Sequence, residues 1–289
     1  MALILASLPL AAQQAVAPVS GKTSVAAAPA PLWMGPDGQP LPWQSADEAV
    51  EFLRRARIGK TTGTKRGITQ PRKMELERDG IRANAIFHDI NEDKRNIQLR
   101  GGERIPSFRD CYLFQIAAFE LARLLGVQNV PPSVKRTFAG RTGSLTLWLE
   151  GMVTDEMRRE QKREPAGAEV IRWNRQMTIM HVWDNLIYNF DRNQGNILLD
   201  KDWNVWLIDH TRAFRRDDRL PRPDQLTSCE RSFFERLGAV DPATVKQRLK
   251  AYLGPPEIEA LMKRRDLIVA HFEKLLRERG EEKVFFTYP

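Results

Sequence analysis

Asn189-Phe-Asp-Arg-Asn-Gln-Gly-Asn196, followed by Ile197-Leu-Leu and then Trp206-Leu-Ile-Asp-His210, is the stretch that decides the fold. Its apolar segments, within 197–208, predict a buried β-hairpin that turns at Lys201-Asp202. A hairpin brings the residue before its first strand next to the residue after its second strand. Asn196 and Asp209 are therefore expected at the same end of this hairpin, with Asp191 five residues before Asn196.

These residue types suit phosphoryl transfer from a nucleotide. That reaction needs metal ions that bridge phosphates and a carboxylate near the attacking hydroxyl. Asp191 can orient or deprotonate a hydroxyl, while Asn196 and Asp209 can offer oxygen ligands to Mg²⁺ or Mn²⁺. The alternative is that all three only form turns beside a hairpin, because Asp and Asn favour turns. Their combined spacing favours the phosphotransferase hypothesis.

Residues 184–210 resemble the catalytic and metal-binding loops of the protein-kinase-like superfamily. The form without a preceding His-Arg-Asp is similar to the atypical branches: phosphoinositide kinases, HipA-type kinases and secretory-pathway kinases. The resemblance implies that Asp191 is the catalytic residue and that Asn196 and Asp209 bind the metal. Asp209-His-Thr stands in the place of Asp-Phe-Gly. Asn189, Arg192 and His210 are implied as supporting residues.

The order of predicted elements fits an α+β, bilobal protein-kinase-like fold with a small β-rich N-lobe and a helical C-lobe. The N-terminal lobe is expected at 43–150 and the catalytic lobe at 151–289, with a hinge near Leu149–Met152. The order does not suit a doubly wound sheet, because regular alternation of strands and helices is missing. ATP and a divalent cation, Mg²⁺ or Mn²⁺, are the implied cofactors.

The N-terminal part departs from the pattern of the superfamily, which uses a Lys on the third strand and a Glu on the next helix to bind phosphates. His88 occupies the expected Lys position, and the Glu position falls on Gln115 or Glu120. Glu120 is the better match in charge, and Gln115 fits the more natural alignment. Lys60, Lys65, Arg66 or Lys73 can substitute for the Lys.

Glycines recur at Gly59, Gly63 and Gly67 within 58–68. Glycines allow backbone amides to approach phosphates closely, so this segment is a candidate phosphate loop, with Gly63 and Gly67 as candidate nucleotide contacts. A flexible loop without that role is an equally good interpretation.

The remaining elements follow from capping and turn signals. Ser45-Ala-Asp-Glu48 is a capping box that opens a helix at 46–57, and Asp79-Gly80 predicts a hairpin turn. The expected elements are strands at 73–77 and 81–90, a helix at 108–125, a hairpin at 133–138 and 144–149 that turns around Ala139-Gly140, a helix at 168–188, and helices over 227–279 with breaks near 240–242 and 254–256.

Residues 1–42 are expected to be a signal peptide and a flexible linker. The apolar run Ala2–Ala12 is too short to span a bilayer and is followed by small residues, as in a secretory signal. No Lys or Arg precedes Lys22, so the usual positive start is absent. Export, to the periplasm or outside the cell, is favoured over a cytoplasmic location. No later segment has eighteen uninterrupted apolar residues, so no transmembrane segment is expected.

Composition places only a few limits on the partners and ligands of this protein. The net charge of +8 is compatible with an acidic partner or with a well-solvated basic surface. Basic residues are not interleaved with aromatics and no zinc spacing occurs, so nucleic-acid binding has little support. Cys111 and Cys229 match no metal pattern, and their spacing leaves open whether they pair. The charged run Arg212–Arg219 either recruits an acidic substrate or is a solvated loop.

The sequence therefore predicts an ATP-dependent phosphotransferase that acts on a hydroxyl, most simply one on a protein. Two alternatives stay open. One is a kinase-like binding module without catalysis, because the phosphate-binding Lys is missing. The other is an enzyme that transfers AMP with the same metal site.

Overall fold

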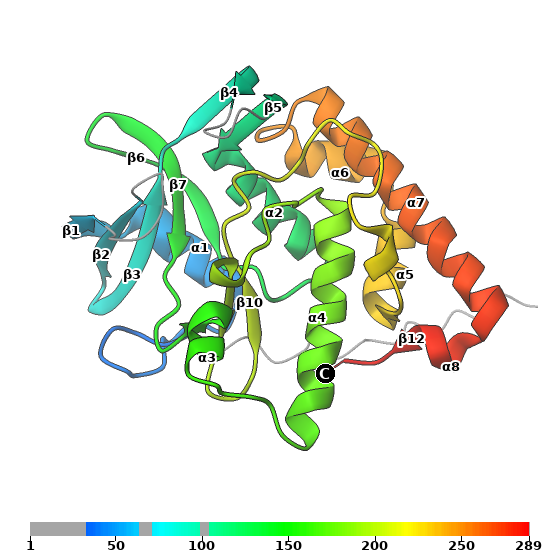
Figure 1. Cartoon of the computed structure of the whole chain (residues 1–289). Coiled ribbons are helices and arrows are strands. Elements are labelled where there is room, and N and C mark those ends of the chain that lie inside the picture. The colour runs from blue at the N-terminus through cyan, green and yellow to red at the C-terminus, as the bar shows by residue number, and fades with distance from the viewer. Residues whose placement is uncertain (1–32, 64–70, 99–103, 289) are drawn as a thin grey trace, which may run out of the picture.

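The computed structural model describes residues 33–63, 71–98 and 104–288. The expected signal segment and Gly67 lie outside the described residues. Figure 1 shows the arrangement of the described elements, with a β-sheet on one side and most of the helices on the other. Within the described parts of the chain, no helix is both long and apolar enough to cross a membrane.

A five-stranded antiparallel sheet forms the first part of the fold. Its order is β1-β2-β3-β7-β6, from Arg57–Gly63, Arg72–Arg78, Ile81–His88, Arg141–Leu147 and Ser133–Phe138. Asp79-Gly80 and Ala139-Gly140 form its two-residue turns, and all four residues have positive φ. Such a backbone matches the right-handed twist of the flanking strands, and both predicted turns are confirmed.

Two helices pack on this sheet against β6 and β7. Helix α1, Ala46–Arg55, begins at Ser45, whose hydroxyl accepts the N–H of Glu48 at 3.3 Å. It ends before Arg57, where β1 begins. Helix α2, Tyr112–Leu125, ends at Gly126, which has φ 69°. Glycine adopts this left-handed conformation at little cost, as the predicted helix end requires.

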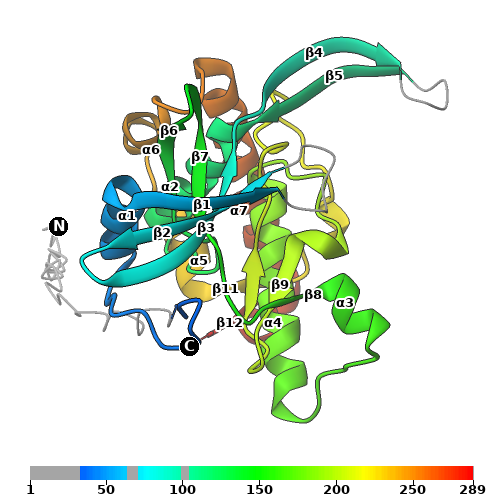
Figure 2. The ribbon, with the colours of Figure 1, turned by 90° about the vertical axis from the view of Figure 1, so that its left-hand side faces the viewer.

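The predicted helix at 108–125 begins too early. Residues Arg104–Cys111 instead form β5, which pairs with β4, Asn91–Gln98, from Asn91↔Cys111 outward. The residue pattern over 91–111 does not indicate this hairpin, whose backbone hydrogen bonds override the apolar helical pattern at its end. Figure 2 shows β4 and β5 extending away from the main sheet. The glycine-containing run 58–68 is likewise a strand as far as Gly63, paired with β2.

Helices dominate the second part of the fold. They are α3 Asp155–Glu160, α4 Ala168–Leu186, α5 Arg231–Ala239, α6 Pro242–Leu249, α7 Pro255–Arg279 and α8 Glu281–Val284, with short 3₁₀ turns at Gln194–Asn196 and Pro223–Gln225. The predicted breaks near 240–242 and 254–256 are confirmed. The predicted helical start at 227 is wrong, because Cys229–Glu230 forms β11 beside β12, Phe285–Phe286.

A small three-stranded sheet lies next to these helices, with the order β10-β9-β8. Strand β8 is Val153–Thr154, β9 is Ile197–Leu199 and β10 is Val205–Leu207. The pair β9–β10 is the hairpin predicted from the sequence. The core continues through α4, where Trp183 is fully buried. Phe114 of α2 meets Phe214 with ring centroids 5.8 Å apart, so α2 packs on the segment that follows β10.

Cys111 and Cys229 are both buried and do not form a disulfide. Burial raises the pKa of each thiol, so neither is activated as a thiolate.

Gly143 of β7 permits the close pairing of β7 with β3. A Cβ atom at this position would lie 2.4 Å from the carbonyl oxygen of His88 and 2.9 Å from the ring of Phe87. Gly143→Ala is therefore expected to lower the free energy of unfolding by about 1–3 kcal/mol, because β3 and β7 must separate. Urea denaturation measures the change.

Gly238→Ala is the matched control, because a Cβ atom on Gly238, in α5, would meet nothing within 4 Å. Alanine is the better helix former, so this variant is expected to be neutral or more stable by up to about 1 kcal/mol. Equal urea midpoints for Gly143→Ala and the wild type would contradict the prediction.

Candidate active site

A cavity of about 730 Å³ lies where the main sheet, the start of α2 and the β9–β10 hairpin meet. Its size is within the range of pockets that bind small ligands. Apolar side chains from both sheets and their connection line it: Ile86, Leu147, Leu149, Met152, Leu198 and Ile208. A second, polar group of lining residues includes His88, Asp110, Gln115, Asp191, Asn193, Asn196, Asp209 and Arg212.

The β9–β10 hairpin positions two of these polar residues. Ile197 pairs with Leu207, and the N–H of Ile208 donates to the carbonyl oxygen of Asn196 at 3.2 Å. Asn196 and Asp209 therefore flank the same end of the hairpin, as its geometry requires. The side-chain amide of Asn196 donates to the carbonyl oxygen of Asp191 at 3.2 Å, which ties Asp191 to the hairpin.

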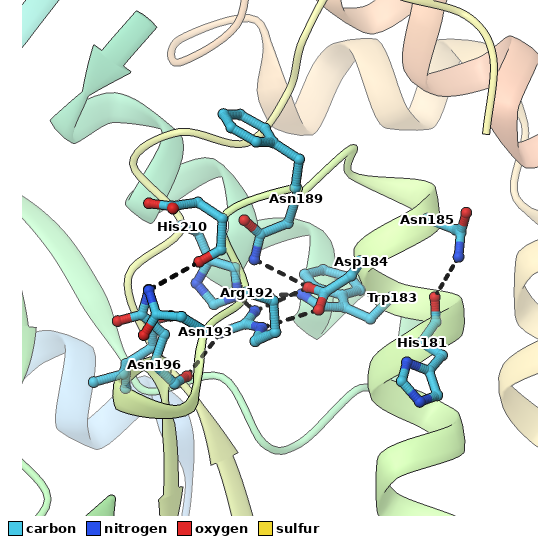
Figure 3. Close-up of polar contacts among 12 residues, drawn as sticks. His181, Trp183, Asp184, Asn185, Asn189, Arg192, Asn193, Asn196 and His210 are labelled. Atoms are coloured by element: carbon cyan, nitrogen blue, oxygen red, sulfur yellow. Dashed lines mark hydrogen bonds and ion pairs between the residues drawn. The ribbon is translucent and has the colours of Figure 1, made fainter. Parts of the chain in front are cut away.

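Arg192 holds the loops around the site together, and its side chain is only 2% exposed. Its Nε and Nη2 donate to the two carboxylate oxygens of Asp184, each at 2.9 Å. Its Nη1 donates to the carbonyl oxygens of Asn196 and Ile208, both at 2.8 Å. Figure 3 shows Arg192 between Asp184 of α4 and Asn196, the residue that precedes the first strand of the hairpin.

Asn189 completes this arrangement. Its side-chain amide donates to Asp184 Oδ1 at 3.0 Å, and its backbone N–H donates to the carbonyl oxygen of Asp184. Asp184 thus receives hydrogen bonds from two of the three residues that the sequence marks as supporting, Asn189 and Arg192. The pair Arg192–Asp184 is buried and bidentate, the geometry in which a guanidinium fixes a carboxylate most specifically.

His210 is fully buried beside Asp209. Its Nε2 faces two donors, Trp183 Nε1 at 3.3 Å and Arg192 Nη2 at 3.1 Å. Because a guanidinium can only donate, Nε2 accepts and the ring proton lies on Nδ1. Burial and, next, the positive charge of Arg192 lower the pKa of His210 well below its ordinary value. His210 is therefore neutral, and its role in the fold is to accept hydrogen bonds.

The neutral state of His210 has a consequence for stability in acid. The unfolded chain binds a proton at this residue below about pH 6.5, while the folded protein does not, so the free energy of unfolding falls as the pH falls through that value. From pH 6.5 to 5.5, wild type is expected to lose about 1 kcal/mol more than His210→Gln, whose amide oxygen still accepts. Urea denaturation at several pH values measures both curves.

His181, whose pKa burial also lowers, is present in both proteins, so its contribution cancels in the comparison. Parallel pH curves for the wild type and His210→Gln would show that His210 does not cause the loss.

Asp209 has φ 54°, in the left-handed region. Asp tolerates this conformation better than most residues, yet it still costs energy and must be held by its surroundings. Three hydrogen bonds hold the segment: Thr211 Oγ1 to Asp209 Oδ1 at 2.9 Å, the N–H of His210 to Gln115 Oε1 at 3.0 Å, and the N–H of Cys111 to the Thr211 carbonyl at 2.8 Å. The start of α2 thus fixes the segment that carries Asp209.

Asp191 lies half-buried in the cavity. Arg212 Nη1 donates to its Oδ2 at 2.9 Å. Burial raises the pKa of Asp191, Arg212 lowers it, and the charge of Asp209 raises it again, with a net rise. A carboxylate with a raised pKa is a stronger base than a solvated one, which suits a group that accepts a proton.

The other residues predicted from the sequence fall into two groups. His88 at the end of β3 and Gln115 of α2 line the cavity together with Asp191, Asn196 and Asp209. Glu120 does not: it is five residues further along α2, where it pairs with Arg248 of α6 at 3.4 Å. Of the two candidates for the Glu position, only Gln115 therefore faces the cavity.

Lys73 also lies outside the set of residues that line the cavity. Its ammonium group lies 4.3 Å from the ring centroid of Trp148 and 3.4 Å from Glu150, at the connection that follows β7. Gly63 is the last residue of β1, and a Cβ atom there would meet nothing within 4 Å. The roles of Lys73 and Gly63 in nucleotide binding stay predictions.

Asp110 and Arg212 line the cavity, and sequence reasoning assigned neither of them to the site. Asp110 is 2% exposed and accepts a hydrogen bond from Arg212 Nε at 3.1 Å. Arg212 thus joins Asp110 to Asp191. The charged run Arg212–Arg219 indicates Arg212 only as part of a possible substrate segment. The sequence signal for Asp110 is a carboxylate just before an apolar helix, and it is hidden because the apolar pattern predicts a helix that already includes residue 110.

No protein-family model matches the sequence, and no curated protein matches it. Among solved structures, the chain is similar to Fam20 from hydra, determined with a sugar: the TM-score is 0.61 at 17% identity, over 84% of this chain and 92% of that one. It also matches the proinflammatory kinase CtkA of Helicobacter pylori, with a TM-score of 0.48 and 13% identity over 77% and 97% of the two chains. The second likeness is too distant to support an argument.

The fold is therefore an atypical protein-kinase-like fold of the α+β class, and this prediction from the sequence is confirmed. At such identities the likeness establishes the fold alone. What the chain does has to be argued from its own residues.

Proposed function

We propose that this protein is an ATP-dependent phosphotransferase of the atypical kinase type, which transfers phosphate to a hydroxyl group on a protein. The observation that carries the proposal is the meeting of Asp191, Asn196 and Asp209 at one cavity of about 730 Å³. A base of a nucleotide suits the apolar lining, and phosphates and metal suit the polar lining.

Asn196 and Asp209 are the residues that would hold a divalent metal. Carboxylate and amide oxygens are hard ligands of the kind that Mg²⁺ prefers. Mg²⁺ is commonly held by one or two protein groups together with the phosphates of a substrate. A divalent metal held by Asn196 and Asp209 would neutralise the negative charge that develops on the phosphates during transfer. Among the described residues, no group of three or more His, Cys, Asp or Glu could hold a metal ion.

Gln115 supplies a further group that fits a phosphate. Its Oε1 accepts the N–H of His210, whereas its buried Nε2 has no hydrogen-bond partner among the described residues. A buried donor without a partner costs free energy, so a ligand oxygen that accepts from it would stabilise the site. In this proposal Gln115 donates to a phosphate oxygen from the start of α2.

Asp191 acts on the acceptor in the proposed reaction. Its carboxylate accepts a hydrogen bond from the acceptor hydroxyl and takes its proton as the hydroxyl oxygen forms a bond to the terminal phosphorus. The bond between that phosphorus and the bridging oxygen breaks, and ADP leaves with the electron pair. Positioning and electrostatics supply most of the rate enhancement in such reactions.

The proposal also includes an acidic protein as the acceptor and export of this protein from the cytoplasm. The run Arg212–Arg219 lies after Asp209, where an acidic protein substrate would be recognised, but Arg216 and Arg219 are already paired with Glu257 and Asp217. Export rests on residues 1–42 and is proposed from their composition.

The test uses the full chain and two differently labelled nucleotides. ATP with Mg²⁺ or Mn²⁺ is expected to raise the melting temperature, while ATP with a chelator is not. Transfer of label from γ-labelled ATP to protein hydroxyls supports the proposal. Transfer only from α-labelled ATP would identify an AMP-transferring enzyme instead. ATP binding without transfer of either label, together with an Asp209→Ala protein that still performs its cellular role, would identify a binding module without catalysis.

A further inference from the structure

The charges that line the cavity are strongly unbalanced. Four carboxylates line it, those of Asp110, Glu156, Asp191 and Asp209, while Arg212 is the one Lys or Arg among its described lining residues. A nucleoside triphosphate adds several further negative charges. Like charges at close range repel strongly in a partly buried site, so phosphate binding there needs positive groups from the protein as well as metal. Strand β3 offers His88 at the position where a Lys was expected.

Arg212 is held from one side and open on the other. Its Nε donates to Asp110 Oδ2 at 3.1 Å, and its guanidinium carbon lies 5.1 Å from the ring centroid of Phe108. Both partners belong to β5, which fixes one face of the group. Its Nη1 donates to Asp191 at 2.9 Å, and Nη2 makes no hydrogen bond among the described residues. The side chain keeps 22% of its surface exposed.

We propose that Arg212 binds the terminal phosphate of the nucleotide and that Asp110 is the positioning residue that keeps it in place. This inference rests on the proposed phosphotransferase function and assigns one residue of that site. A guanidinium presents several N–H donors in a plane and suits phosphate oxygens, which often accept two of them at once.

The two partners of Arg212 have different parts in this arrangement. Asp110 is almost fully buried, so its charge keeps Arg212 beside the cavity whether or not nucleotide is bound. Asp191 is more exposed, and its hydrogen bond from Nη1 can be exchanged for one to a phosphate oxygen. Nucleotide binding then releases the Asp191 carboxylate for the acceptor hydroxyl. Arg212 thereby joins nucleotide binding to the availability of Asp191.

The test compares the affinities of ATP, ADP and AMP in the presence of Mg²⁺, measured by titration calorimetry. Arg212→Gln is expected to weaken ATP binding about 10- to 100-fold, the effect of losing a charge-assisted hydrogen bond to phosphate. ADP is expected to lose less than ATP, and AMP is expected to stay within about twofold. Arg212→Lys keeps the charge but not the planar geometry, so it should recover part of the ATP affinity.

Arg219→Gln is the matched control, from the same segment. Arg219 is exposed and pairs with Asp217, and it does not line the cavity. Its replacement is expected to leave all three affinities unchanged. Because Arg212→Gln leaves the charge of Asp110 buried without its partner, Asp110→Asn/Arg212→Gln is the second variant, which removes both charges. It is expected to show the same selective loss of ATP affinity.

The possible results separate the inference from the function on which it rests. Wild-type protein that binds ATP, with an Arg212→Gln variant that binds it equally well, overturns the inference alone. Equal losses of affinity for ATP, ADP and AMP in Arg212→Gln and in Asp110→Asn/Arg212→Gln also overturn it, because they indicate a structural role. Wild-type protein that binds no nucleotide with either Mg²⁺ or Mn²⁺ overturns the proposed function and this inference together.

Discussion

Asp191→Asn is expected to lower kcat for phosphate transfer by about 10²- to 10⁴-fold, the usual contribution of a positioned acid or base. The amide keeps the shape of the side chain and cannot take a proton from the acceptor. ATP affinity is expected to stay within about threefold, because Asp191 is proposed to act on the acceptor. Initial rates with γ-labelled ATP, measured at saturating nucleotide, give kcat directly.

Asp209→Asn is the informative comparison, because Asp209 follows the second strand of the hairpin at the same end as Asn196. It replaces the proposed carboxylate ligand with a neutral amide, so metal-dependent ATP binding should weaken by at least about 10-fold. Asp202→Asn is the control: Asp202 is an exposed carboxylate at the turn of the same hairpin, paired with Lys201 at 2.9 Å. It should change neither kcat nor affinity. An Asp191→Asn protein with wild-type kcat would remove Asp191 from its proposed role.

Arg192→Met is expected to lower the free energy of unfolding by about 3–5 kcal/mol, the typical cost of removing one partner of a buried ion pair. The substitution leaves the charge of Asp184 buried and takes hydrogen bonds away from the carbonyl oxygens of Asn196 and Ile208. Urea denaturation, followed by fluorescence, measures the loss. The rate of phosphate transfer should fall as well, because the residues that flank the two strands of the hairpin, Asn196 and Ile208, lose their common hydrogen-bond donor.

The matched control for this prediction is Arg219→Gln, because Arg219 forms an exposed ion pair with Asp217. Exposed ion pairs contribute little to stability, so the free energy of unfolding of this variant should be close to that of the wild type. A second variant, Asp184→Asn/Arg192→Met, removes both charges and should be more stable than Arg192→Met alone. A loss below about 1 kcal/mol in Arg192→Met would show that the buried pair does not stabilise the site.

Local signals explain why much of this fold could be predicted. The turns at Asp79-Gly80 and Ala139-Gly140 and the hairpin after Asn196 depend on residues that are neighbours in the sequence. Their geometry therefore follows from a few backbone preferences. The β4–β5 hairpin carried no such signal. Its pairing is a property of the whole ladder, and the apolar pattern beyond residue 108 favoured a helix.

In the candidate site, too, some features follow from residues that are neighbours in the sequence and others depend on tertiary packing. Asp191, Asn196 and Asp209 lie within one short stretch, so their spacing could suggest a common role. Asp110 and Arg212 are 102 residues apart and meet only because α2 packs on the segment after β10. The choice between Gln115 and Glu120 also depended on the face that α2 turns to the cavity. Sequence spacing alone does not determine that orientation.

The junction between β5 and α2 joins, through hydrogen bonds, two segments that are far apart in the sequence, since Asp110 and Arg212 are 102 residues apart. The hairpin β4–β5 leads directly into the residues that bond Thr211, His210 and Arg212. If a ligand of the hairpin favours one arrangement of this junction and nucleotide favours the same one, each must raise the affinity of the other by an equal factor. Measuring either affinity with and without the second ligand would therefore report the same coupling free energy.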